Sequence, residues 1–123
     1  MNSFNILRDN KKILSYLYLF LSILGAILPM MANFEFVREY GNSFDLSNFI
    51  ALANANPAAQ SISRDLLVGA SGIFIWIVNE SKKLDIKNMW VVYVGTSLIA
   101  FAFSAPFFLF LRERRIIELE KIN

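Results

Sequence analysis

Polar side chains gather just before an apolar segment in the middle of the chain. Arg64 and Asp65 stand directly before the charge-free run 66–78. The Asn-Pro pair at 56–57 is a helix start signal, with Asn as N-cap and Pro in the first turn. A helix that begins there carries Arg64 and Asp65 about two turns, roughly 10 Å, inside its N-terminus. The start of this helix and the residues just before it then form a patch of amide, hydroxyl and charged groups. The members of the patch are Asn54, Asn56, Gln60, Ser61, Ser63, Arg64 and Asp65.

Two carboxylates in this part of the chain are candidates for catalysis. Ionisable side chains inside a membrane span are costly and mark functional sites. A carboxyl group partly removed from water holds a proton more readily, so Asp65 is a candidate general acid, assisted by Arg64 or Glu80. The alternatives are structural. Arg64 would then extend to the lipid head groups, Asp65 would lie at a shallow interface without a role, and Glu80 would pair with Lys83 at the membrane surface.

The absence of two residue types limits the chemistry further. The chain of 123 residues contains no cysteine and no histidine. Disulfides, thiol nucleophiles, iron–sulfur clusters and zinc–thiolate sites are therefore excluded, and the usual general base and metal ligand is missing. No phosphate-binding loop or dinucleotide fingerprint is present. We expect no metal and no cofactor, and the sequence favours a protein that is not an enzyme.

Long apolar segments predict an all-α integral membrane bundle. Runs 13–32 and 89–111 contain no charged side chain, and about 20 helical residues cross the hydrocarbon of a bilayer. A helix over 57–80, about 36 Å long, also spans. We expect one membrane domain over residues 1–123, with three transmembrane helices at about 12–32, 57–80 and 89–111. The first is expected to be a retained anchor, because its apolar run exceeds that of a signal peptide.

A short helix is expected between the first and second spans, at about 45–54. Apolar residues recur there at helical spacing, at Leu46, Phe49, Ile50 and Ala53. Ser43 or Asp45 is available as its N-cap. We expect this helix to lie in the head-group interface or to fold back on the bundle; a lid without lipid contact is the alternative. Folded back over the middle helix, it would close a small ligand-binding pocket at Phe49, Asn56, Gln60, Ser61, Arg64 and Asp65.

Small residues and prolines predict how the spans pack. Gly25, beside the small residues at 22 and 26, would let a second helix approach closely. Gly69 and Gly72 are expected to do the same for the middle helix. Pro29 and Pro106 are each expected to kink or end a helix.

The charge distribution indicates contact with lipid rather than nucleic acid. The net charge is +2, and the basic residues stand at the ends of the predicted spans, as expected near anionic head groups. We therefore expect a multi-pass protein of the cell membrane, with no nucleic-acid partner. With three spans, Lys and Arg divide evenly between the two sides, so the positive-inside rule does not choose an orientation. Arg64 lies within a helix and Lys121 is far from a span, which tips the expectation to a cytoplasmic N-terminus.

Several short motifs together resemble a bacterial family of small membrane proteins known only as a domain of unknown function. The resemblance extends from about Tyr18 to Arg112. It rests on the motifs Gly25 to Pro29, Phe49, Asn56-Pro57-Ala58-Ala59 with Asp65, Trp76 with Glu80, and Pro106-Phe107-Phe108-Leu109 followed by Arg112-Glu113-Arg114. It implies an integral membrane protein with three spans and no established activity.

Three functions agree with these observations. The leading one is a small membrane protein that is not an enzyme and binds an apolar or lipid-like molecule, or acts as a subunit of a homo-oligomer or larger membrane complex. The second is a membrane-embedded enzyme that acts on an isoprenoid or other lipid with Asp65 as general acid. The third is a subunit of a proton- or ion-coupled transporter.

Overall fold

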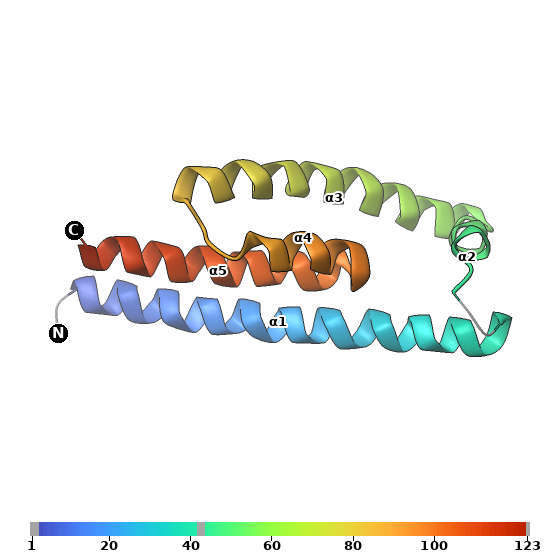
Figure 1. Ribbon diagram of the computed structural model, residues 1–123, viewed down its shortest axis with the longest axis horizontal. Helices are drawn as coiled ribbons and strands as arrows, with labels where there is room; N and C mark the ends of the chain where they lie inside the picture. The colour runs from blue at the N-terminus through green and yellow to red at the C-terminus, as the bar shows by residue number, and fades with distance from the viewer. Residues whose placement is uncertain (1–2, 42–43, 123) are drawn as a thin grey trace.

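The computed structural model describes residues 3–41 and 44–122 of the chain. This part is all-α, as the sequence predicts, and its helices are α1 (Ser3–Tyr40), α2 (Leu46–Ala53), α3 (Pro57–Leu84), α4 (Met89–Leu98) and α5 (Phe101–Ile122). α1 and α3 form two long outer rods, and α4 and α5 lie between them (Figure 1). The beginning of α1 and the end of α5 lie at the same end of the molecule, which we call the terminal end.

α1 and α3 are long and apolar enough to cross a membrane, over Asp9–Tyr40 and Pro57–Leu84. Only 11% and 6% of their most apolar windows are buried within the protein, whereas a core helix of a soluble protein hides its apolar side chains. α1 does not end at Pro29 but continues through it to Tyr40. The first span was expected to end at about residue 32, and this prediction is corrected, because the helix continues for eight more residues.

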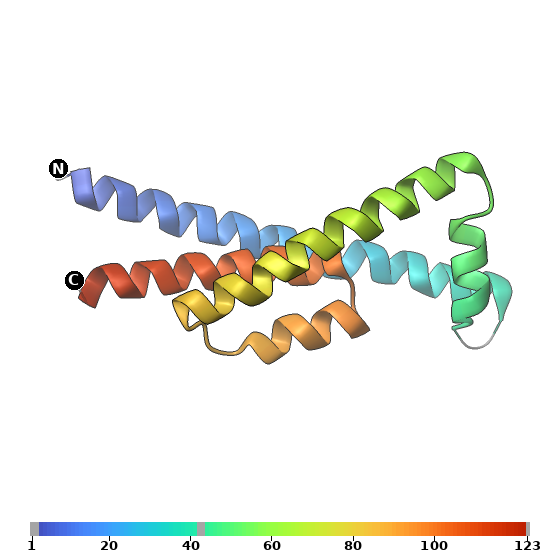
Figure 2. The same ribbon diagram turned by 90° about the horizontal axis from the view of Figure 1, so that it is seen from above.

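α2 begins at the cap that the sequence offers. Asp45 is its N-cap, and an oxygen of its carboxylate accepts a hydrogen bond from the backbone N–H of Asn48 at 3.2 Å. Ser43, the other predicted cap, lies outside the described residues. The ring of Phe49 packs edge-on against Phe36 of α1, with centroids 5.3 Å apart. α2 therefore lies across the ends of α1 and α3 (Figure 2).

The apolar run 89–111 is not one helix, so the expectation of a single helix over this run is corrected. The structure breaks the run at Ile99, whose φ of −107° and ψ of −80° are not helical. α4 and α5 fold back on each other as a hairpin, visible in Figure 2. The two helices approach closely at Gly95, which is buried and has no side chain. The ring of Phe103 occupies the space that a Cβ at Gly95 would need. Pro106, the expected kink, lies inside α5 and is not the break.

Small residues hold α5 against α1, as predicted for the segment around Gly25. A Cβ at Gly25 would overlap the backbone oxygen of Ala102, so the two helix backbones touch there. Ser22, one turn earlier on α1, is also buried. The prediction for Gly69 and Gly72 is wrong, because no atom from another part of the protein lies within 4 Å of a Cβ at either position.

Candidate functional site

Three of the polar groups at the start of α3 are engaged in holding helix ends together. Asn56 is the predicted N-cap, and its side-chain oxygen accepts from the backbone N–H of Ala59 at 2.8 Å. The Gln60 amide donates to the backbone oxygen of Asn54 at 3.1 Å, and the Ser63 hydroxyl donates to that of Ala53 at 2.8 Å. These bonds fix the C-terminal end of α2 on the first turns of α3.

An apolar cleft with two lobes lies beside this junction. The α1 lobe, of about 700 Å³, lies between residues 29–37 of α1, the start of α2 and the hairpin tip at 97–102. The α3 lobe, of about 830 Å³, lies between α2, residues 63–75 of α3, and the hairpin. Phe49 and Phe101 line both lobes, so the two lobes adjoin. We call them together the apolar cleft.

The cleft exists because the hairpin reaches only part of the way along α1 and α3, as Figure 1 shows. Between the hairpin tip and the end of α3, α5 lies between the two long helices. Beyond the hairpin tip, α1 and α3 continue without it, and α2 lies across their far ends. The lining is mainly aromatic and aliphatic, with polar side chains at Asn33, Ser97, Asn54, Ser63, Arg64, Ser71 and Thr96.

The structure brings only two of the predicted ligand-binding residues to this cleft. Phe49 lines both lobes and Arg64 lines the α3 lobe. Asn56 and Gln60 are occupied in the helix caps described above and line neither lobe. Ser61 and Asp65 are exposed and also lie outside both lobes, so the predicted pocket contains only part of the polar patch.

Arg64 is the cationic group at the cleft. Its side chain is exposed, and among the residues that the structure describes it forms no ion pair. The planar guanidinium group carries five N–H donors and suits a phosphate or carboxylate. The cleft thus combines an apolar interior with one cationic donor.

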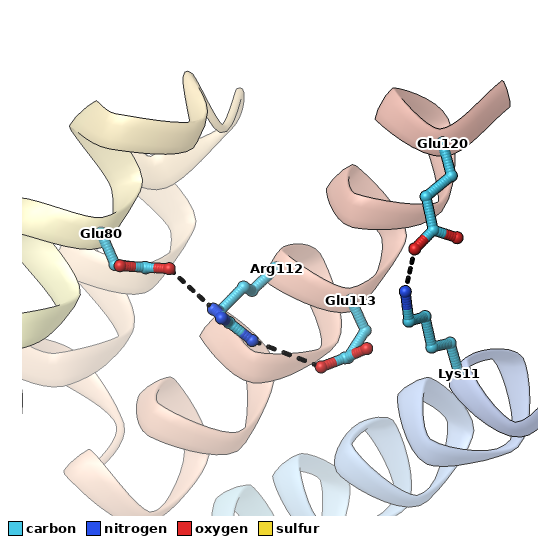
Figure 3. A network of polar contacts seen from close by, with 5 residues as sticks. All are labelled: Lys11, Glu80, Arg112, Glu113 and Glu120. Atoms are coloured by element: carbon cyan, nitrogen blue, oxygen red, sulfur yellow. Dashed lines mark hydrogen bonds and ion pairs between the residues drawn. The ribbon is translucent and has the colours of Figure 1, made fainter. Parts of the chain in front are cut away.

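A second polar cluster, which no sequence pattern predicts, joins α3 to α5 (Figure 3). Arg112 donates through Nε to a carboxylate oxygen of Glu80 at 3.1 Å and through Nη1 to Glu113 at 3.4 Å. Its guanidinium carbon also lies 5.7 Å from the centre of the Trp76 ring. The side chain of Glu80 is only 14% exposed. The expected partner of Glu80, Lys83, is therefore corrected to Arg112, and the pair is interhelical.

Further contacts tie the charged end of α5 to its neighbours. Arg115 donates to the backbone oxygen of Leu84 at the end of α3, at 2.8 Å. Glu120 pairs with Lys11 on α1, as Figure 3 shows. α5 thus reaches α1 and α3 through charged groups at the terminal end, away from the apolar cleft. These contacts are structural in character, because Lys11, Glu120, Arg112 and Glu80 are each bonded to a group on another helix.

Comparison with known proteins places the chain in a family. A family model described as "Protein of unknown function DUF2834" matches residues 17–114. The chain belongs to the DUF2834 family. The match contains the apolar cleft and the Glu80–Arg112 pair, so both lie in the part shared with the family model. The match confirms the expectation that the chain belongs to a family known only as a domain of unknown function. No curated protein and no solved structure matches the chain.

Proposed function

We propose that this DUF2834 protein is an integral protein of the cell membrane that binds a lipid-like molecule in the apolar cleft. α1 and α3 are the proposed membrane-crossing helices, and α2, which lies across their ends, is the proposed interfacial helix. The lengths, composition and low burial of α1 and α3 support this placement. We further propose that the N-terminus lies on the cytoplasmic side.

The observation that carries the proposal is the position of the cleft between the two proposed spans. The cleft continues onto apolar surface that would face the bilayer, since Leu66 and Leu67 line it and are 59% and 69% exposed. An opening on the hydrocarbon at this depth admits acyl chains rather than water-soluble molecules. The volumes of the lobes, about 700 and 830 Å³, lie in the range of small-molecule sites.

Arg64 supplies the polar end of the proposed ligand site. It stands about two turns from the start of α3, close to the proposed membrane surface. A lipid whose acyl chain enters the cleft there would place its head group near the guanidinium group. The proposed ligand is therefore an amphiphile with a phosphate or carboxylate head group.

The enzyme and transporter hypotheses draw less support from the geometry. Asp65, the proposed general acid of the enzyme hypothesis, is exposed and lies outside the cleft. Glu80, the other candidate, is already bonded to Arg112. Neither carboxylate therefore faces the apolar space in which a lipid substrate would lie.

The test is photo-crosslinking in nanodiscs made with phosphatidylglycerol that carries a diazirine on its acyl chain. We expect adducts to concentrate on Leu66, Leu67 and Phe101, compared with exposed positions of α1 such as Phe20. Ala70→Trp fills the α3 lobe and should reduce the adducts on Phe101 several-fold. Val68→Trp, on the same helix but outside the lining, is the matched control and should leave them unchanged.

Two outcomes would contradict the proposal. One is an even spread of adducts over all lipid-facing positions, which would indicate ordinary contact with bulk lipid. The other is protection of the cleft positions by a co-purifying protein, which would favour the subunit hypothesis. Phosphatidylcholine keeps the phosphate but has no net charge, so exchanging it for phosphatidylglycerol tests the net negative charge of the head group. Arg64→Gln should remove the preference for the anionic lipid without removing the adducts.

A further inference from the structure

The structure assigns α4 and α5 as a re-entrant hairpin, which enters and leaves the membrane on the cytoplasmic side and places both termini there. This inference rests on the proposed membrane location and goes beyond the proposed ligand site. It replaces a third crossing by a helical hairpin of half the membrane depth. It also gives a stronger reason for the cytoplasmic N-terminus, which an even division of charge over three spans supports only weakly.

Neither helix of the hairpin is suited to cross the bilayer alone. α4 has 10 residues, or about 15 Å of helix, which is half of the roughly 30 Å hydrocarbon thickness. α5 has 22 residues, but its apolar part covers only 101–111. The next residues are Arg112, Glu113, Arg114 and Arg115, and such charges are expensive inside lipid.

Contacts with α1 give the depth of the hairpin tip. Ala102, directly after the tip, touches Gly25 on α1. Gly25 lies about 20 Å along the helix from Lys12 and about 15 Å from Glu35, the nearest charged residues on either side. The tip is therefore close to the middle of the proposed membrane. At the other end of α5, Glu120 pairs with Lys11, at the level where α1 leaves the apolar layer.

The hairpin also satisfies much of its backbone without water. Irregular backbone inside a membrane is tolerated where its polar groups are bonded or covered by protein. At the tip, the N–H groups of Ile99 and Ala100 both donate to the oxygen of Gly95 at 2.9 and 3.0 Å, and that of Ser104 donates to Ala100 at 3.1 Å. The hydroxyl oxygens of Thr96 and Ser104 lie 2.7 Å apart and join the two helices.

The distribution of positive charge then chooses the orientation. With α5 returning to the terminal end, that end collects all but two of the 12 Lys and Arg residues. Arg38 and Arg64 are the two at the opposite end. The even division that three spans would give becomes strongly one-sided. Because short loops rich in Lys and Arg stay in the cytoplasm, the terminal end is cytoplasmic. The apolar cleft, which lies beyond the hairpin tip, then opens to the outer leaflet.

The absence of cysteine from the natural sequence allows a direct test. Single variants Lys83→Cys, Lys121→Cys and Arg38→Cys, all at exposed positions, are treated with a membrane-impermeant maleimide in intact and permeabilised cells. We expect Arg38→Cys to react in intact cells. Lys83→Cys and Lys121→Cys should react only after permeabilisation. Leu98→Cys, at the exposed hairpin tip, should resist labelling in both conditions because it lies in lipid.

The outcomes separate this inference from the proposed function. Reaction of Lys121→Cys in intact cells, with Lys83→Cys protected, would show a third crossing and overturn the hairpin. Reaction of both lysine positions in intact cells would overturn the orientation. Release of the protein from membranes by alkaline carbonate would instead overturn the membrane location itself. Failure of lipid crosslinking, with the expected labelling pattern, would remove only the ligand.

Discussion

At the scale of single residues, Arg112 joins two carboxylates where α3 meets α5. It bonds Glu80 across the helix interface and Glu113 on its own helix, and it lies against the Trp76 ring. Partial burial makes this arrangement matter more than a surface pair, because an unpartnered carboxylate there would lose its hydrogen bond and regain little water. We therefore regard Arg112 as the main polar tie between these helices.

Arg112→Gln is expected to lower the free energy of unfolding by about 1–3 kcal/mol, because Glu80 loses its charged donor. Thermal unfolding in mild detergent measures the loss. Arg38→Gln is the matched control, since its pair with Glu35 is 3.9 Å long and the side chains are 80% and 75% exposed; we expect a change of no more than about 0.5 kcal/mol. When Glu80→Gln is already present, adding Arg112→Gln should lower the free energy of unfolding by less than it does in the natural protein. Equal losses in both backgrounds would show that the pair is not coupled.

At the scale of elements, the contact between α1 and α5 depends on one missing side chain. Gly25 allows the backbone of α5 at Ala102 to touch α1. Helix association in lipid relies on such close packing, because the bilayer offers no hydrophobic drive between helices. The same contact fixes where the hairpin tip lies along α1, so the position of the cleft along α1 depends on it as well.

Gly25→Ala is expected to destabilise the fold by about 1–3 kcal/mol, because the added methyl group displaces the backbone of α5. Gly69→Ala is the control. It adds a methyl group where no atom of another segment lies within 4 Å, and alanine favours a helix by up to about 1 kcal/mol. The two variants should therefore shift the thermal midpoint in opposite directions. A shift of the same sign and size in both would contradict the described packing.

At the scale of the whole molecule, the protein leaves many of its large apolar side chains exposed. The buried apolar core contains few large side chains, among them Ile77, Val92 and Phe108. Long apolar side chains on α1 and α3 are instead exposed, such as Leu17 at 54% and Val68 at 72%. Contiguous exposed surface of this kind needs a bilayer, a detergent or a partner to cover it.

We expect the purified protein to be monodisperse in mild detergent or nanodiscs and to aggregate when the detergent is diluted below its critical micelle concentration. Size-exclusion chromatography with light scattering measures both states. A monodisperse, helical protein in plain buffer would contradict the membrane location, because the exposed faces of α1 and α3 would then need no cover.

Local sequence signals determined much of the helical structure. Asp45 and Asn56 act as caps where the sequence places them, because a capping side chain bonds backbone groups only a few residues away. The all-α class followed from the long charge-free runs, and the close contact at Gly25 followed from its small neighbours. Family membership was also readable, since the motifs behind the resemblance lie within the matched residues.

Only the tertiary structure decided the rest, because it depends on contacts between residues distant in the chain. Composition cannot tell one helix over 89–111 from a hairpin, since both are built from the same charge-free apolar run. The fold-back at Ile99 depends on Gly95 meeting Phe103, and the position of the tip along α1 depends on Ala102 meeting Gly25. The partner of Glu80 is likewise found 32 residues away, at Arg112. The apolar cleft follows from these contacts, because it occupies the space that the shortened hairpin leaves open.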